Sequence, residues 1–319
     1  MITLDDIKRA QSLLNGIAVR TPLLEWTGVT ARHKLFLKLE NLQPIGAFKL
    51  RGAYNKLSSL SEEDLRRGVI SYSSGNHGQG VAYAARVLGV KAVIVMPGNA
   101  PKNKLEATAA LGAEVVTVGP SSEERRLRAE QLAAEHGYAI VPPYNDEKII
   151  AGQGTVGLEI LEDLPEVETV LAPVGGGGLI SGISAAIKLT NPNVKIIGIE
   201  PELAGDARAS LRAGHIVSFS AEQVTQTLAD GLRTQSIGEI NFEHIRAYVD
   251  DIVSVRENEI LEATRALSGN PKTLAEPSGA VAVAAFMFHS AELPQTANNV
   301  AVISGGNIDP QLLVEIRKP

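Results

Sequence analysis

Residues 169–182 read TVLAPVGGGGLISG. An apolar run ends in four successive glycines, and a second apolar segment of small residues follows them. The pattern predicts a buried strand over 169–174, a glycine loop, and a helix over 179–190. A strand that passes through a loop into a helix is the repeating unit of a parallel sheet covered by helices.

The same alternation continues on both sides of this unit. Before it, the pattern predicts strands at 69–74, 91–96, 113–118 and 138–141, with helices at 77–88, 101–111 and 122–136. After it, we expect strands at 194–200, 247–254 and 300–304, with helices at 204–213, 257–268 and 277–290. Right-handed crossovers then give an α/β fold of two lobes, each a mostly parallel sheet flanked by helices. We expect a large domain from residues 1–68 and 145–319 and a small domain from residues 69–144.

Composition narrows the class of protein. The chain has 319 residues, a formal net charge of −6 and no cysteine. The acidic balance argues against nucleic acid as a partner, and the missing cysteines exclude disulfides, thiolate catalysis and cysteine-based metal sites. The first residues, MITLDDIKRA, do not resemble a signal peptide, and no apolar run is long enough to span a bilayer. We therefore expect a cytoplasmic protein without a membrane partner.

The glycine loop is the first candidate site. Gly175, Gly176, Gly177 and Gly178 expose backbone N–H groups, and the helix that follows adds the positive end of its dipole. The loop is therefore a candidate seat for a phosphate group. A tight strand-to-helix turn is the alternative. Because the spacing is neither GxGxxG nor GxxxxGK[ST], dinucleotide and P-loop nucleotide sites are weak interpretations.

A lysine in the segment GAFKLRGA (residues 46–53) is the second candidate. Lys49 stands among apolar and small residues, and partial burial lowers the pKa of an amine, which makes it available as an imine-forming nucleophile. A surface lysine at a helix start is the alternative. An imine-forming lysine together with a phosphate seat suggests pyridoxal 5′-phosphate as the cofactor.

Six segments together resemble one enzyme family. GAFKLRGA, SSGNHGQG, AGQGT, VGGGGL, ADGLR and ISGGN occur in the order and spacing of the fold-type-II (tryptophan synthase β-like) pyridoxal phosphate enzymes. The chain is most similar to the serine/threonine dehydratases and serine racemases. The resemblance implies that Lys49 holds the cofactor, that Phe48 lies near its ring, and that Gly175–Gly178 bind its phosphate. It places Ser304 against the pyridine nitrogen, where a neutral hydroxyl leaves the ring a moderate electron sink.

The segment SSGNHGQG (residues 73–80) precedes a predicted helix, whose free N–H groups suit a substrate carboxylate. A helix cap is the alternative. By resemblance, Ser73, Asn76 and the backbone of His77 hold the carboxylate, and Asn76 also touches the ring oxygen of the cofactor. A hydroxyl at Ser74 could move the α-proton on the face opposite Lys49, as racemisation requires.

Further candidates follow from the resemblance. Glu200, the carbonyl of Ala204 and Asp206 correspond to the divalent metal site of family racemases and metal-activated dehydratases, and such oxygen ligands suit Mg²⁺ or Ca²⁺. Acidic residues that serve a helix dipole are the alternative. Thr234 could meet a substrate β-hydroxyl. Ala47 departs from the family pattern, in which serine usually stands there.

These features predict a pyridoxal phosphate-dependent ammonia-lyase, or dehydratase. Its substrate would be a small 3-hydroxy amino acid of the serine, threonine or 3-hydroxyaspartate type, and its products a 2-oxo acid and ammonia. The nearest alternative is an amino-acid racemase that uses Lys49 and Ser74 on opposite faces. A non-catalytic protein that binds a phosphate ligand through the glycine loop is a remote third possibility. The resemblance also implies a homodimer.

Overall fold

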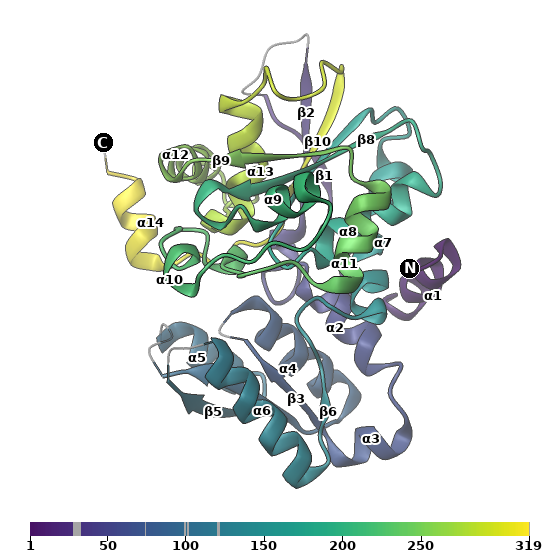
Figure 1. The fold of residues 1–319 in the computed structure, drawn as a ribbon, viewed down its shortest axis with the longest axis vertical. Coiled ribbons are helices and arrows are strands. Elements are labelled where there is room, and N and C mark those ends of the chain that lie inside the picture. The colour runs from purple at the N-terminus through teal and green to yellow at the C-terminus, as the bar shows by residue number, and fades with distance from the viewer. Residues whose placement is uncertain (28–32, 74, 99, 101, 120–121, 319) are drawn as a thin grey trace.

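The computed structural model describes residues 1–27, 33–73, 75–98, 100, 102–119 and 122–318. Its strands form two separate sheets, one of six strands and one of four. Figure 1 shows these sheets in two halves of the molecule, with helix α2 (Lys49–Leu57) where the halves meet. The predicted α/β fold with two mostly parallel sheets is confirmed. The predicted domain boundaries stay a prediction.

The six-stranded sheet has the order β1-β2-β10-β7-β8-β9. Only β1 runs antiparallel to its neighbour, and every other pair is parallel. The strands are β1 (Leu23–Glu25), β2 (Lys34–Leu39), β7 (Thr169–Pro173), β8 (Lys195–Pro201), β9 (Asp251–Val255) and β10 (Asn298–Ile303). We call this sheet and the helices packed on it the large lobe.

Helices cover both faces of this sheet. The helices of the large lobe are α1 (Leu4–Leu13), α7 (Glu147–Asp163), α8 (Gly178–Lys188), α9 (Asp206–Ala213), α10 (Ala221–Val224), α11 (Glu239–Tyr248), α12 (Glu257–Leu267), α13 (Pro277–Phe288) and α14 (Pro310–Ile316). Short 3-10 turns are η1 (Glu40–Leu42), η2 (Glu202–Ala204) and η3 (Asp230–Leu232). Side chains along each strand alternate between two buried clusters. Leu171 of β7 packs with α12 and α13, whereas its neighbours Val170 and Ala172 pack with α7, α8 and α11.

The four-stranded sheet is parallel throughout and has the order β5-β4-β3-β6. Its elements are β3 (Val69–Tyr72), α4 (Asn76–Leu88), β4 (Ala92–Pro97), α5 (Lys102–Ala110), β5 (Glu114–Val118), α6 (Ser122–His136) and β6 (Ala139–Ile140). Helices α4 and α5 pack on one face of the sheet and α6 on the other, which makes the small lobe. The short α3 (Glu62–Arg67) leads from α2 into β3.

One predicted strand begins later than expected. The pattern over 247–254 predicts an extended segment, but residues 239–248 form α11 and the strand starts only at Asp251. Phe242 and Ile245 explain the difference, because their spacing of three residues places both on the buried face of a helix.

Helix α2 is fixed to the large lobe by unusually close backbone contact. A Cβ atom added to Gly152 of α7 would lie 2.6 Å from the backbone of Arg51 and Gly52 in α2. One added to Gly182 of α8 would lie 2.4 Å from the backbone nitrogen of Gly154 in α7. The motif AGQGT therefore lets three helices touch at their backbones, and it supports the helix that Lys49 begins.

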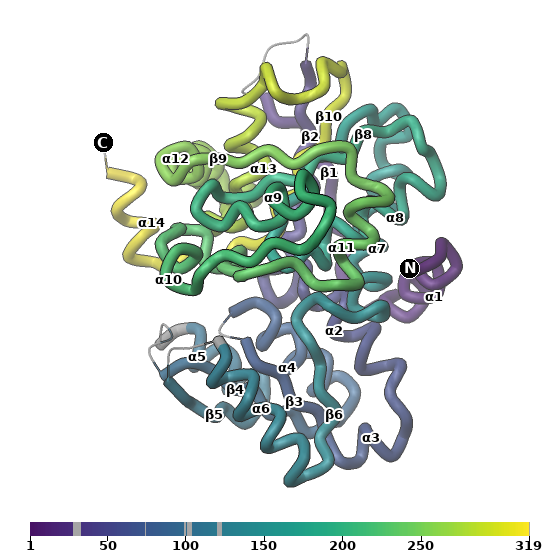
Figure 2. Tube along the Cα trace, viewed as in Figure 1, coloured from purple at the N-terminus to yellow at the C-terminus, as the bar shows by residue number. Residues whose placement is uncertain are grey.

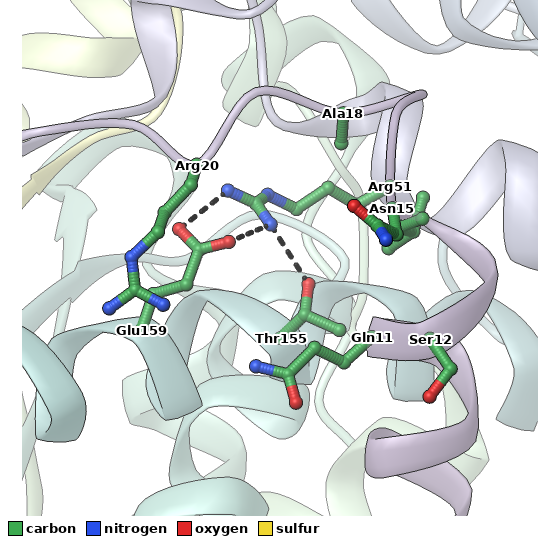
Figure 3. A pocket seen from close by; sticks show the side chains of 9 residues that line it. Gln11, Ser12, Asn15, Ala18, Arg20, Arg51, Thr155 and Glu159 are labelled. Atoms are coloured by element: carbon green, nitrogen blue, oxygen red, sulfur yellow. Dashed lines mark hydrogen bonds and ion pairs between the residues drawn. The ribbon is translucent and has the colours of Figure 1, made fainter.

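A buried ionic cluster reinforces the same helix. The Arg51 guanidinium makes a bidentate contact with Glu40, at 2.8 Å to each oxygen, and donates to Glu159 at 2.6 and 2.9 Å. The Lys38 amine, which is fully buried, contacts Glu159 at 2.7 Å and the carbonyl of Thr21. Figure 3 shows Arg51 reaching Glu159 and Thr155 beside a cavity of about 320 Å³. Two cations and two anions thus neutralise one another inside the large lobe.

Candidate active site

Lys49 begins α2. Figure 2 shows this helix where the two lobes meet. Its amine donates a hydrogen bond of 2.8 Å to the carbonyl of Pro143 and lies 5.1 Å from the centre of the Phe48 ring. Burial lowers the pKa of the Lys49 amine to about 8. About a tenth of the amine is therefore neutral near pH 7, and this is the form that an imine-forming lysine uses.

The segment before Lys49 is joined to the end of strand β10. Ala47 pairs with Gly305 in an antiparallel bridge, and the Phe48 amide donates to the Ser304 carbonyl at 3.1 Å. The Gly306 amide donates to the Gly46 carbonyl at 2.9 Å. Two of the six sequence motifs are therefore neighbours, and Ser304 is buried close to the backbone that carries Lys49.

The predicted glycine loop connects β7 to α8, as the sequence pattern indicates. Gly177 has a φ of +93°, a left-handed conformation that favours glycine, and it caps α8 without a side-chain hydrogen bond. A Cβ atom on Gly176 would lie 2.3 Å from the ring of Tyr144, and Gly175 packs against Leu232 of η3. The loop is therefore a cradle of bare backbone that is walled by the Tyr144 ring.

Helix α4 presents its N-terminus to the same region. Gly75 is the residue that precedes the helix, and since glycine has no side chain, it gives the first amides of α4 no capping hydrogen bond. A Cβ atom on Gly80 would lie 3.1 Å from the Lys49 carbonyl, which shows how closely α4 approaches the start of α2. Ser73 immediately precedes this turn, whereas Ser74 lies outside the described residues.

His77 is buried behind the N-terminus of α4. Its Nε2 donates to the Val141 carbonyl at 3.1 Å, and its Nδ1 has no hydrogen-bond partner in the described part of the chain. Burial and the positive charge of Lys49 lower the pKa of His77 to about 3, although the bond to Val141 opposes this. The imidazole is therefore neutral at physiological pH, so His77 does not offer a positive charge to a substrate carboxylate.

Asn76 connects the small lobe to the large lobe. Its amide donates to Glu276 at 2.5 Å, and its carbonyl accepts a 2.8 Å hydrogen bond from Asn307. Asn307 also donates to the Ile45 carbonyl at 2.9 Å. Burial and the negative charge of Asp230 raise the pKa of Glu276 to about 7. The predicted ligand Asn76 is thus fixed by two side chains that sequence reasoning did not assign to it.

The predicted metal ligands cluster at the end of β8. Glu200 accepts hydrogen bonds from the backbone amides of Ala207 and Arg208, each at 3.1 Å. Burial and the nearby Asp206 raise the pKa of Glu200 to about 8, and burial raises the pKa of Asp206 to about 7. One oxygen of Asp206 is buried without a hydrogen-bond partner among the described residues.

Two features of this acidic pair bear on its role. Ala204 is buried at the end of η2, two residues before Asp206, and the contact of its carbonyl with the acidic pair stays a prediction. No group of three histidine or acidic side chains suitable for a metal occurs in the described ranges. The dipole alternative is also realised, because Glu200 accepts amides of the first turn of α9. Burial of both carboxylates, and the charge of Asp206 near Glu200, favour either protonation or a compensating cation here.

Thr234 follows η3, on the loop that adjoins the glycine cradle. Its hydroxyl is buried and has no hydrogen-bond partner in the described structure. Its amide donates to the Leu232 carbonyl, and Leu232 in turn packs against Gly175. The placement is compatible with the predicted contact to substrate, which stays a prediction.

Comparisons with known proteins place the chain in a family. Residues 15–305 match the family described as "Pyridoxal-phosphate dependent enzyme", and the chain belongs to that family. It is 48% identical to an L-threonine ammonia-lyase of Thermotoga maritima, with 99% of this chain and 78% of that protein covered. It is 42% identical to the catabolic L-threonine dehydratase TdcB of Escherichia coli K12, with 97% of this chain and 94% of that protein covered.

Solved structures give the same assignment. Maize serine racemase superimposes with a TM-score of 0.93 at 37% identity, covering 98% of this chain and 96% of that one. The serine racemase of Dictyostelium discoideum superimposes with a TM-score of 0.89 at 38% identity, covering 97% and 99%. The predicted resemblance to fold-type-II pyridoxal phosphate enzymes of the dehydratase and racemase type is confirmed.

Proposed function

We propose that this protein is a pyridoxal phosphate-dependent ammonia-lyase that converts a small 3-hydroxy amino acid, threonine or serine, into a 2-oxo acid and ammonia. The names of the relatives agree with the predicted lyase activity, because L-threonine ammonia-lyase and dehydratase are 48% and 42% identical over nearly the whole chain. The observation that carries the proposal is Lys49, whose depressed pKa and position between the lobes suit an imine-forming amine.

The residues present fit the cofactor. A cradle of bare amides at Gly175–Gly178 suits its phosphate, and a neutral hydroxyl at Ser304 suits the pyridine nitrogen. Lys49 would hold it, with Phe48 beside its ring and Asn76 near its ring oxygen. When bound, pyridoxal phosphate supplies an electron sink that stabilises negative charge at the substrate α-carbon.

The protein's own residues then have separate tasks. Lys49 would take the α-proton, since its amine is partly neutral near pH 7. Ser73, Asn76 and the amides at the start of α4 would bind the substrate carboxylate. The neutral His77 would keep this turn in place through its bond to Val141, and Thr234 would meet the β-hydroxyl.

A direct experiment tests the cofactor and the reaction together. Purified protein is incubated with pyridoxal phosphate, and borohydride reduction followed by peptide mass analysis identifies the labelled residue. We expect the label on Lys49 and ammonia release from L-threonine or L-serine, with Lys49→Ala lacking both. If the parent protein takes up no label, and the Lys49→Ala variant still binds a phosphate ligand, the result would favour the remote alternative, a non-catalytic phosphate-binding protein.

Racemase activity is the second candidate function, because maize serine racemase superimposes with a TM-score of 0.93. A racemase would use Lys49 and Ser74 on opposite faces of the substrate. Product chirality and α-proton exchange with solvent, measured beside 2-oxo acid release, separate the two activities. If Ser74→Ala lost racemisation and kept elimination from one enantiomer, the two-face scheme would stand. If it changed neither rate, that scheme would fail.

We also propose a divalent cation, Mg²⁺ or Ca²⁺, at Glu200, Asp206 and the Ala204 carbonyl. The support is the chemistry of the donors: two buried carboxylates with raised pKa values and one unpartnered oxygen on Asp206. Titration of chelator-treated protein with each metal, followed by thermal unfolding, tests this. We expect a stabilisation that Asp206→Asn abolishes, and equal curves for both proteins would rule the site out.

Assembly and location complete the proposal. Among the described residues, no helix combines the length and apolar character needed to cross a bilayer. We propose a cytoplasmic homodimer with the small domain at residues 69–144 and the large domain at residues 1–68 and 145–319. Light scattering coupled to size-exclusion chromatography measures the assembly, and a mass close to that of one 33.8 kDa chain would contradict the dimer.

A further inference from the structure

An ion pair joins the two lobes at the side away from the chain connections. Lys104 of α5, in the small lobe, donates its amine to Asp230 of η3, in the large lobe. Figure 1 shows α5 at the edge of the small lobe opposite α2 and α3, through which the chain passes from one lobe to the other. On the α2 side, the small lobe is joined to the large lobe by the chain itself and by the apolar packing of α4 on α2. On the α5 side, it is joined by this ion pair.

Lys104 is unusual for a lysine because it is buried, with only 8% of the residue exposed. Burial alone would lower the pKa of Lys104, yet the charges of Asp230 and Glu276 hold it above its ordinary value. The amine is therefore charged while the lobes are in contact. A buried ammonium without its carboxylate is strongly disfavoured, so separating the lobes must either rehydrate Lys104 or leave it unpaired.

Asp230 is held in place by the large lobe. The Ser278 hydroxyl approaches its second oxygen at 3.4 Å, and the next amide, that of Gly231, donates to the same hydroxyl at 2.8 Å. Ser278 lies in the first turn of α13, and its carbonyl accepts from Ser304 at 3.4 Å. The anchor for Lys104 is thus part of the frame that carries the candidate cofactor site.

The helix that carries Lys104 also packs on α4. Helix α5 contacts α4, and Leu105 of α5 packs in the same core cluster as Val81 and Ala85 of α4. The N-terminus of α4 carries Asn76, which itself reaches Glu276 and Asn307 of the large lobe. A displacement of α5 would therefore also move α4, whose first turn faces Lys49.

We propose that Lys104 is a positioning residue whose ion pair with Asp230 holds the small lobe closed and sets α4 against Lys49. The pair opens when an amino acid enters and forms again over the bound substrate. The link to substrate rests on the proposed function, whereas the closure of the lobes does not.

The chain offers a clean way to measure closure, because it contains no cysteine. Ala134→Cys in α6 and Gln226→Cys after α10 place one spin label on an exposed position of each lobe. Labelled chains are diluted into an excess of unlabelled chains, so that distances within one chain dominate in the proposed homodimer. Pulsed electron spin resonance on the cofactor-loaded protein then gives the distance distribution between the two labels. Into this background we introduce Lys104→Met, Asp230→Asn, and the exchange of Lys104→Asp with Asp230→Lys.

We expect Lys104→Met and Asp230→Asn each to raise the fraction of long distances at least about twofold, and the exchanged pair to restore part of the short-distance population. Lys91→Met is the matched control, because Lys91 pairs with Glu114 on the exposed surface of the small lobe alone. It should leave the distribution unchanged. Far-ultraviolet circular dichroism shows that each variant is folded.

A kinetic measurement connects closure to substrate. Because the substrate enters the open form and is held tightly only after closure, a less favourable closure weakens the apparent affinity, so the KM for L-threonine should rise as the closed fraction falls. A folded Lys104→Met or Asp230→Asn protein with the parent distance distribution would overturn the proposal. A parent protein without lyase activity would refute the proposed function and leave the distance measurement to decide the closure.

Discussion

The two lobes hold their parts of the candidate site in different ways. On the large-lobe side, helix α2 meets α7 at backbone contact through Gly52 and Gly152, and Arg51 is fully paired with buried carboxylates. On the small-lobe side, α4 also packs on α2, with Val81 in the same apolar cluster as Ala53. Its contacts with the sheet side of the large lobe, and those of α5, are instead made by single polar side chains, Asn76 and Lys104. Close packing resists displacement in every direction, whereas a few hydrogen bonds can break and form again.

This difference suggests a division of labour. Lys49 belongs to the rigid side. A group that binds a cofactor and transfers a proton reacts faster when its position is fixed. The turn before α4 belongs to the adjustable side, and a substrate must enter and leave there. Substitutions on the rigid side should therefore reduce stability, and substitutions across the interface should mainly reduce catalytic efficiency.

The largest effect should come from Arg51→Met. The substitution removes the cation that pairs with buried Glu40 and leaves Glu159 with Lys38 alone, and breaking a buried pair in this way typically costs about 3–5 kcal/mol. Urea unfolding of the cofactor-free protein measures the change. The control is Arg126→Met, which breaks the surface pair with Glu130 in the small lobe and should cost less than about 1 kcal/mol. Equal losses would remove the contrast between the lobes.

Much of this arrangement could be predicted from the sequence. Alternating apolar runs and glycine stops indicated the order of strands and helices, because both signals are local. The pairing of Glu276 and Asn307 with Asn76 could not be predicted, since these residues lie 200 and 231 positions away along the chain. The role of AGQGT also could not be predicted, because the contact that a glycine in a helix permits depends on which helix packs against it in the fold.

Gly182→Ala should have the next largest effect. The new methyl group would lie 2.4 Å from the Gly154 nitrogen and the Ile150 carbonyl, and neither backbone atom can move without shifting α7. Overpacking of this kind costs about 1–3 kcal/mol. Gly98→Ala, on an exposed turn of the small lobe where the nearest atom is 3.4 Å away, is the matched control and should be nearly neutral. Differential scanning calorimetry of both variants checks this.

The acidic pair sharpens the comparison through pH. The pKa of Glu200 is raised from its ordinary value of 4.5 to about 8 in the folded protein. Between these two pH values, Glu200 is therefore protonated in the folded protein and ionised in the unfolded chain. Stability of the metal-free protein should therefore fall as pH rises from about 4.5 to about 8. Urea unfolding at about pH 5.5 and at about pH 8.5 gives the free energy of unfolding near the lower and upper ends of this range, and the difference measures the pH dependence.

Glu200→Gln removes this titration, so its stability should depend less on pH than that of the parent protein. Glu202→Gln, at an exposed neighbouring position, should keep the parent slope. Saturating Mg²⁺ or Ca²⁺ should flatten the parent slope, because a cation replaces the protons. A parent slope that neither substitution nor metal changes would show that other groups are responsible.

The smallest change in stability should come from Asn307→Ala, at the interface itself. The substitution removes the hydrogen bonds to Asn76 and to the Ile45 carbonyl, which together should cost about 1 kcal/mol. Because Asn76 then keeps only Glu276 as a partner, α4 should be less well placed and kcat/KM should fall about tenfold, with Asn193→Ala on the surface as control. A loss of stability with unchanged kcat/KM would mean that the interface only holds the lobes together. The reverse result, a large kinetic loss for little stability, is what an adjustable substrate side requires.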